Sequence, residues 1–306
     1  MMRTASGSTA ATSVGSESKH DSITALCALD IPTVKIGSQE DPFIVINNIQ
    51  QRASLTKLTG MTLEKFTQWD ESPSRRGRLF FYSAEHEVLI IKLPLSEIHE
   101  YLHRTLDKEI TRQMSEDLYG EISAYGSATY YMRKSGMVTA AGEGDSSLGL
   151  KDRRKNDRWP TVVIEAGWSQ SRAALVAKAH WWFEASNRAV KIVLLIIASP
   201  LQIQVEKWKT NPLPHSSAVA PNRPNTRLFQ RQATNLYPKV HPPVLTVNRA
   251  SANTPSNDYR VTSSPLRLEF RDVFLRDPVP PEGDVLLEER FFRSYAEEAW
   301  ENVLDQ

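Results

Sequence analysis

The chain has 306 residues, of which 37 are Lys or Arg and 36 are Asp or Glu, giving a formal net charge of +1, and 40% are hydrophobic. This composition is typical of a soluble globular protein and excludes a collagen-like, coiled-coil or fully disordered chain. The single cysteine, Cys27, excludes an internal disulfide and a site of several thiolates, so we expect an intracellular protein, nuclear or cytoplasmic. The longest apolar run, residues 192–198, is far shorter than the roughly 20 residues that cross a bilayer, so no membrane segment is expected.

Residues 1–22 are rich in Ser, Thr, Ala and Gly and predict a disordered tail, and residues 23–306 are expected to form a single domain. Short apolar stretches within residues 31–49 predict one or two strands, and residues 79–93 predict a hairpin. Ser96 is expected to cap a helix over residues 97–118, because apolar residues recur there at intervals of three or four.

The centre of the chain predicts an α/β core. Strands are expected near residues 121–132 and 137–141, followed by a glycine-rich turn over 142–149 and a charged loop over 151–158. The run WPTVVIEAG at 159–167 has the length of a buried strand, residues 169–187 have helical periodicity, and residues 190–198 predict a second buried strand. Strand, helix and strand in 40 residues indicate a right-handed crossover, with the two strands side by side or nearly so.

The last third is expected to be less regular. Residues 211–257 are rich in Pro, Asn, Ser and Thr and predict a long irregular insertion. Residues 258–306 then carry the final strand and helix: residues 264–274 alternate like a half-buried strand, and residues 285–304 have helical periodicity.

Glu165 ends an otherwise apolar strand, where a lone carboxylate is costly unless it is paired or binds a cation. Asp145 lies 20 residues earlier, so a strand reversal could bring both acids to one sheet edge, where they could hold a hard divalent cation such as Mg²⁺ or Mn²⁺. A turn residue at 145 and a salt bridge at 165 are the alternative interpretation.

The order of HE in a helix, then GDSSLG, WPTVVIEAGWSQS, LVAKAHWWFEASN and VKIVLLI resembles a restriction-endonuclease-like domain of the PD-(D/E)xK superfamily, in versions found in uncharacterised fungal proteins. The resemblance covers about residues 90–210. It implies a mixed β-sheet flanked by helices that cuts nucleic acid, DNA rather than RNA, with Mg²⁺ or Mn²⁺. By motif position, Glu100 corresponds to the acid of the first core helix, Asp145 to the PD aspartate and Glu165 to the acid of (D/E)xK.

Two positions depart from that pattern: the PD proline is Gly144 and the motif lysine is Gly167. Because the lysine orients water and offsets developing charge, its absence leaves two hypotheses, a metal-dependent nuclease and a catalytically silent module that binds nucleic acid or protein. Gln170 and Lys178 are candidate substitutes for the missing motif lysine. Their ordinary interpretations are a polar residue near the helix cap for Gln170 and a solvated helix residue for Lys178.

His99-Glu100-Tyr101-Leu102-His103 also matches HExxH, the motif in which two histidines bind zinc and the glutamate activates water. A zinc peptidase is therefore a third hypothesis, with its third ligand from Glu116, Asp117 or Glu121. The histidines could equally be surface or packing residues.

In the charged loop, Arg153, Arg154 and Lys155 are candidate contacts to nucleic-acid phosphates. The alternative is that they form an ordinary solvated surface. Trp182 is expected in the core rather than on a base-stacking platform.

Overall fold

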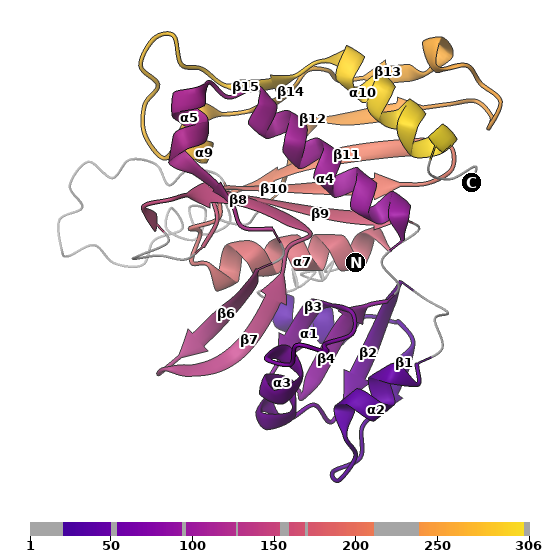
Figure 1. Cartoon of the computed structure of the whole chain (residues 1–306), viewed down its shortest axis with the longest axis vertical. Coiled ribbons are helices and arrows are strands. Elements are labelled where there is room, and N and C mark those ends of the chain that lie inside the picture. The colour runs from indigo at the N-terminus through magenta and orange to yellow at the C-terminus, as the bar shows by residue number, and fades with distance from the viewer. Residues whose placement is uncertain are drawn as a thin grey trace, which may run out of the picture.

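The computed structural model describes residues 21–49, 54–93, 96–126, 128–153, 159–168, 171–210 and 239–302, and within them the protein is mixed α/β. Two main β-sheets lie one beyond the other along the molecule, and helices pack on both faces of the larger sheet (Figure 1). None of the helices in these ranges has the length and apolar character that crossing a membrane requires.

The N-terminal sheet has the strand order β1-β2-β4-β3-β7-β6. Its strands are β1 (Thr33–Lys35), β2 (Leu55–Thr59), β3 (Arg78–Ser83), β4 (Val88–Lys92), β6 (Thr129–Lys134) and β7 (Met137–Glu143). The helices of this region are α1 (Ser22–Cys27), α2 (Pro42–Asn47) and α3 (Leu63–Asp70). Strands β3 and β4 form the predicted hairpin, and their antiparallel register pairs Arg78 with Lys92, so two cationic residues share one end of this sheet.

The central sheet has the order β13-β12-β11-β10-β9-β8-β5. Its strands are β5 (Ile122–Ala124), β8 (Ser146–Leu150), β9 (Val162–Trp168), β10 (Ile192–Ala198), β11 (Gln202–Lys209), β12 (Lys239–Asn248) and β13 (Arg260–Thr262). β9 and β10 are parallel neighbours and are joined through helix α7 (Arg172–Ala185), which confirms the predicted strand–helix–strand unit.

The pleat of β9 sends alternate side chains to opposite faces of the central sheet. Val162 and Ile164 belong to the core cluster that includes helix α4 (Glu97–Arg112), whereas Val163 belongs to the cluster of α7 residues. By the same alternation Glu165 lies on the α7 face, where the indole of Trp182 reaches it. Trp182 is fully buried, which confirms its expected place in the core.

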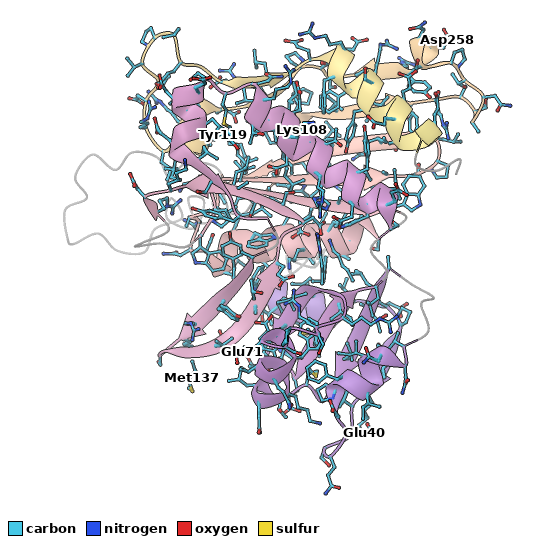
Figure 2. The ribbon with its side chains drawn as sticks, in the orientation of Figure 1. Glu40, Glu71, Lys108, Tyr119, Met137 and Asp258 are labelled. Carbon is cyan, nitrogen blue, oxygen red and sulfur yellow. The ribbon has the colours of Figure 1, made fainter. Side chains whose placement is uncertain are left out.

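Helix α4 begins as predicted, because the Ser96 side chain accepts a hydrogen bond from the His99 amide at 3.3 Å. Its apolar stripe is buried, while Lys108 lies on the exposed side (Figure 2). The predicted end at residue 118 is wrong, because α4 ends at Arg112 and Ser115 caps a separate helix, α5 (Glu116–Glu121).

The expected glycine-rich turn at 142–149 is mostly strand. Only Gly144 and Asp145 lie between β7 and β8, and β8 pairs antiparallel with β9. A side chain at 144 would meet the Val163 side chain at 3.0 Å, so glycine fits this close approach. The chain therefore passes from the N-terminal sheet to the central sheet at Asp145.

Two apolar stretches that suggested strands are helical instead. Within residues 31–49 only β1 is a strand; α2 forms because Asp41 caps it, accepting from the Phe43 amide at 2.8 Å, with Pro42 at the first helical position. In the predicted strand 264–274, β14 (Leu266–Leu268) is followed by α9 (Phe270–Phe274), where Phe270 and Phe274 stack one helical turn apart.

The prediction of an irregular insertion over residues 211–257 is wrong for its second part, because residues 239–248 form β12, which pairs with β11. Its two prolines, Pro242 and Pro243, fall where the register shifts, a position that tolerates missing backbone donors. The 3-10 turn η1 (Ser256–Asp258) follows. β15 (Val285–Leu287) pairs with β14, so the predicted helix 285–304 is shorter, consisting of α10 (Glu289–Glu297) and the π-helical turn η2 (Glu298–Asn302).

Candidate functional site

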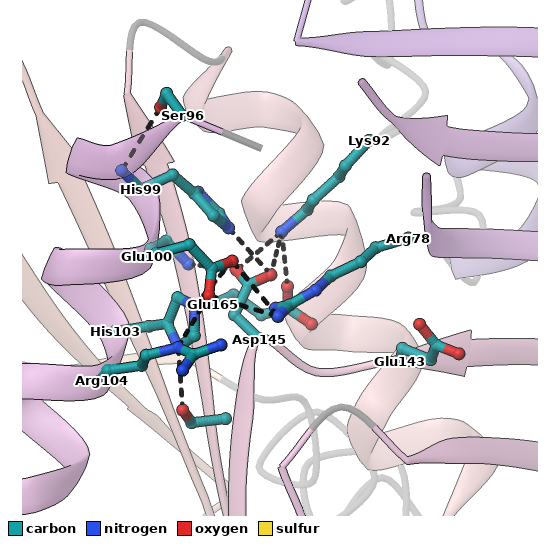
Figure 3. A network of polar contacts seen from close by, with 12 residues as sticks. Arg78, Lys92, Ser96, His99, Glu100, His103, Arg104, Glu143, Asp145 and Glu165 are labelled. Atoms are coloured by element: carbon teal, nitrogen blue, oxygen red, sulfur yellow. Dashed lines mark hydrogen bonds and ion pairs between the residues drawn. The ribbon is translucent and has the colours of Figure 1, made fainter. Parts of the chain in front are cut away.

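Asp145 is the centre of a buried polar network at the junction of the two sheets (Figure 3). The Lys92 ammonium donates to its two carboxylate oxygens at 2.7 and 2.6 Å, and the Ala166 amide donates to Oδ2 at 2.8 Å. His99 Nε2 lies 3.1 Å from Oδ1. Burial alone would raise the pKa of Asp145, but the charge of Lys92 and the contact with His99 hold it well below its usual value, so this carboxylate is ionised.

Glu165 lies beside Asp145 and is fully buried, as a functional or tightly paired acid would be. Its Oε1 accepts from the Trp182 indole at 2.8 Å, and its Oε2 lies 3.4 Å from the Lys92 ammonium. Burial raises the pKa of Glu165 above its usual value, against the opposing charges of Lys92 and Lys178. The structure therefore brings together the two acids that the sequence selected as metal ligands, and holds them in different electrostatic environments.

Lys92 was missed by the sequence interpretation. It ends β4, is only 3% exposed, and contacts both acids, although Gly167 stands at the motif position where a lysine was sought. The available signal was its place in IIKL, where a charged residue closes a buried apolar strand. Arg78, opposite Lys92 in the register of β3 and β4, was missed in the same way.

The first turns of α4 carry His99, Glu100 and His103 into this network (Figure 3), and both histidines are buried rather than on the surface. Glu100 Oε2 accepts from Arg104 Nε at 2.7 Å, and Glu100 Oε1 lies 3.2 Å from Arg78 and 3.5 Å from His103 Nε2. His103 Nδ1 is hydrogen bonded to the Ser146 hydroxyl at 2.9 Å. Burial lowers the pKa of His103 to about 4, so its ring is neutral near pH 7.

Burial alone would raise the pKa of Glu100, but the charges of Arg78 and Arg104 and the contact with His103 lower it below its usual value. The HExxH segment and the acid pair were separate hypotheses at the sequence level, but they occupy one place in the fold. The acids expected to complete a zinc site lie elsewhere, on α5, where Glu121 pairs with Arg276 at 2.7 Å.

Lys178 is fully buried, so its interpretation as a solvated helix lysine is wrong. Its ammonium donates to the Phe80 carbonyl and lies 4.9 Å from the Trp181 ring centre. Burial lowers the pKa of Lys178 to about 8, and the nearby Glu165 charge opposes this shift. Gly142 leaves room for this ammonium, because a side chain there would approach it to 2.6 Å.

The remaining predicted site residues do not join the network. Arg153 donates to the Ala189 carbonyl at 3.4 Å, which ties its loop to the connection before β10. Gln170, Arg154 and Lys155 lie outside the described residues.

A cavity of about 740 Å³ lies beside β6, and two of its lining residues, Tyr130 and Trp159, contact the Trp182 ring. It is lined by aromatic side chains and one cation, namely Tyr125, Tyr130, Tyr131, Trp159 and Arg133. The rings of Tyr130 and Trp159 stack with centres 5.4 Å apart, and both meet the Trp182 ring edge-on. The cavity therefore offers flat apolar surfaces next to the side chain that orients Glu165.

A comparison with protein-family models finds no match for this chain, and a comparison with curated proteins finds none either. The function proposed below therefore rests on the residues of the site and their chemistry.

Proposed function

We propose that this protein is a metal-dependent nuclease with a restriction-endonuclease-like core, which hydrolyses phosphodiester bonds at Asp145, Glu165 and Lys92. The observation that carries the proposal is the meeting of two carboxylates and one ammonium from three separate segments, with Lys92 at 2.6 Å from Asp145 and 3.4 Å from Glu165. These are the groups that the PD-(D/E)xK motif supplies, with the lysine taken from β4 instead of position 167.

The donor set fits a hard divalent cation. Carboxylate oxygens of both acids already converge on one cation, the Lys92 ammonium, and carboxylates are the ligands that Mg²⁺ and Mn²⁺ prefer. Asp145 and Glu165 would hold the ion, with Trp182 fixing one oxygen of Glu165. When bound, such an ion orients water and offsets negative charge on the phosphate.

The protein's own groups have distinct roles in this proposal. Lys92 offsets charge on the reacting phosphate, as a preorganised cation in a buried setting does most effectively. Glu100 positions Arg78 at the edge of the site, and Lys178 supports the charge of Glu165 from the α7 side without contacting substrate.

The proposed substrate is nucleic acid, DNA rather than RNA. Support comes from the aromatic cavity beside Trp182, because Tyr and Trp faces stack on bases and Arg133 could meet a phosphate. Arg153 and the neighbouring Arg154 and Lys155 of the sequence would add to this attraction.

The test is cleavage of supercoiled DNA, linear DNA, single-stranded DNA and RNA with Mg²⁺ or Mn²⁺. We expect Asp145→Asn and Glu165→Gln each to reduce the cleavage rate by about 100-fold or more. The matched control is Asp258→Asn, an exposed acid of η1, which should cleave like the wild type. Equal cleavage by wild type and both site variants would contradict the proposal.

A silent binding module is the second candidate, favoured by one observation. Asp145 is 4% exposed and both of its oxygens are already used by Lys92, so the network can also serve as a buried structural ion pair. This candidate predicts DNA binding without cleavage, and no heat of Mn²⁺ binding in calorimetry.

A further inference from the structure

Three buried nitrogen and oxygen atoms on one face of α4 make no hydrogen bond of good geometry, and their nearest polar neighbours are ion-pair contacts at 3.1 to 3.5 Å. They are His99 Nε2, Glu100 Oε1 and His103 Nε2. One ligand atom from each of the three side chains lies within 4.8 Å of the other two. Leaving a polar atom buried without a partner is costly, and such groups in folded proteins normally have one. Three of them in one place indicate a common partner, because a single cation at their centre would satisfy all three.

The side chains are also held in the orientation that a metal ligand needs. The side chain of His103 is 2% exposed and that of His99 is 7% exposed. His103 Nδ1 is hydrogen bonded to Ser146 Oγ, which leaves Nε2 facing the cluster. Metal-bound histidines characteristically use the second ring nitrogen in this way, to fix the ring.

The two oxygens of the Glu100 carboxylate have different surroundings. Oε2 accepts from Arg104 at 2.7 Å and from Arg78 at 3.3 Å, whereas Oε1 accepts no hydrogen bond and lies 3.2 Å from Arg78 and 3.5 Å from His103 Nε2. Asp145 Oδ1 supplies a further oxygen 3.1 Å from His99 Nε2. The cationic side chains around this cluster are Arg78, Arg104 and Lys92. A bound ion would coordinate Glu100 Oε1, which lies near Arg78, and would leave the hydrogen bond from Arg104 to Oε2 intact.

We infer that His99, Glu100 and His103 form a transition-metal site beside Asp145, one that takes an imidazole-binding ion such as Zn²⁺. The two histidines are four residues apart, so they project from the same face of the helix. Imidazole with carboxylate selects Zn²⁺ and related ions, whereas Mg²⁺ and Ca²⁺ prefer oxygen donors alone. Its three ligands differ from the Asp145–Glu165 pair, although Asp145 Oδ1 lies beside them, and Ser146 of β8 fixes one of its histidines.

The test is a titration of chelator-treated, full-length protein with Zn²⁺, followed by calorimetry and thermal unfolding, and with Co²⁺, followed by visible absorption. We expect one Zn²⁺ per chain and a rise in Tm of about 5 °C at a hundredfold excess over Kd. His103→Gln and Glu100→Gln should each weaken binding at least tenfold. The matched control, His86→Gln, changes an exposed histidine between β3 and β4 and should bind like the wild type.

The inference stands apart from the nuclease proposal, because binding is measured without substrate. Glu165→Gln should abolish cleavage and retain Zn²⁺ binding, so the two ideas can fail separately. Absence of saturable binding at micromolar Zn²⁺ would overturn the inference. So would unchanged binding in both His103→Gln and Glu100→Gln, provided that circular dichroism shows the variants folded.

Discussion

Lys92 carries a buried charge that survives because carboxylate oxygens surround it. Its ammonium is within 2.7 Å of both oxygens of Asp145 and 3.4 Å from Glu165, and the Phe80 ring lies 5.4 Å away. A carboxylate buried alone would lose its charge, and the charge of Lys92 keeps Asp145 ionised by lowering its pKa. Removing either the positive charge of Lys92 or the negative charge of Asp145 therefore destabilises the network.

Removing the lysine alone should be strongly destabilising. We expect Lys92→Met to lower the free energy of unfolding by about 3–5 kcal/mol, because it leaves Asp145 buried and uncompensated. Urea unfolding measures this, with Lys134→Met on the exposed end of β6 as the matched control, expected to change stability by less than about 0.5 kcal/mol. The double variant Lys92→Met/Asp145→Asn should regain part of the loss; a double variant less stable than Lys92→Met would argue against the pairing.

Asp107 shows the opposite case, a partly buried acid whose Oδ1 has no hydrogen-bond partner. Burial raises the pKa of Asp107 from 3.8 to about 6. A carboxyl with a raised folded pKa stabilises the protein only while it is protonated, so this stability is lost as pH rises from about 4 through 6.

Asp107→Asn should therefore stabilise the protein by about 1–2 kcal/mol more at pH 8 than at pH 4, measured by urea unfolding at both values. Asp117→Asn, on the exposed side of α5, is the control and should show no such difference. An Asp107→Asn effect that is the same at both pH values would contradict the assignment.

At the scale of elements, sequence patterns succeeded where one periodicity dominated. β9, α7 and β10 were predictable because a β-branched apolar run, a 14-residue helix and a second apolar run follow one another within 40 residues. α2 was not predictable, because the five apolar residues of this six-residue segment fit either periodicity. β12 was not, because Pro242 and Pro243 are tolerated only through a register shift that tertiary pairing creates.

The first turn of α4 presents His99 and Glu100, so its cap matters to both proposed sites. Ser96→Ala should lower stability by about 1 kcal/mol, because the Ser96 side chain accepts the His99 amide hydrogen bond. Ser96→Asp keeps an acceptor and should remain within about 0.5 kcal/mol of the wild type. Urea unfolding distinguishes them, and equal losses in the two variants would show that the cap does not stabilise α4.

At the scale of the molecule, the site lies where the two sheets meet. The acids and helix α4 were predictable from local spacing, but Lys92 is 53 residues from Asp145 and 73 from Glu165. Only the passage of β7 into β8 through Asp145, beside the end of β4, brings them together. The place of Lys92 at the end of a buried apolar strand marks it as unusual, but no local sequence signal encodes its contact with the two acids.

A second ion-pair group attaches the C-terminal segment to the central sheet. Glu269, which precedes α9, accepts from Lys207 and Lys209 of β11, each at 2.9 Å. Burial alone would raise the pKa of Glu269, but these lysines lower it to about 2. A lowered folded pKa gives stability that is present above about 4.5 and is lost as pH falls toward 2.

Glu269→Gln should accordingly cost about 1–2 kcal/mol at pH 7, after allowance for solvent screening, and much less at pH 2.5. Denaturant unfolding at the two pH values measures the difference. Glu85→Gln, an exposed acid between β3 and β4, should be neutral at both. A Glu269→Gln loss that persists undiminished at pH 2.5 would point to packing rather than charge.

The passage of the chain between the sheets also has a consequence for how this protein can be divided. Arg78 and Lys92 come from the N-terminal sheet, whereas both acids and the histidine helix follow residue 95. The part of the chain before residue 94 thus supplies positive charges, from Arg78 and Lys92, that pair with acids from the part after residue 95. A gene product beginning at residue 96 would retain every carboxylate of the network, together with Arg104 and Lys178, but would lack Arg78 and Lys92, so the two pieces would need to be produced together.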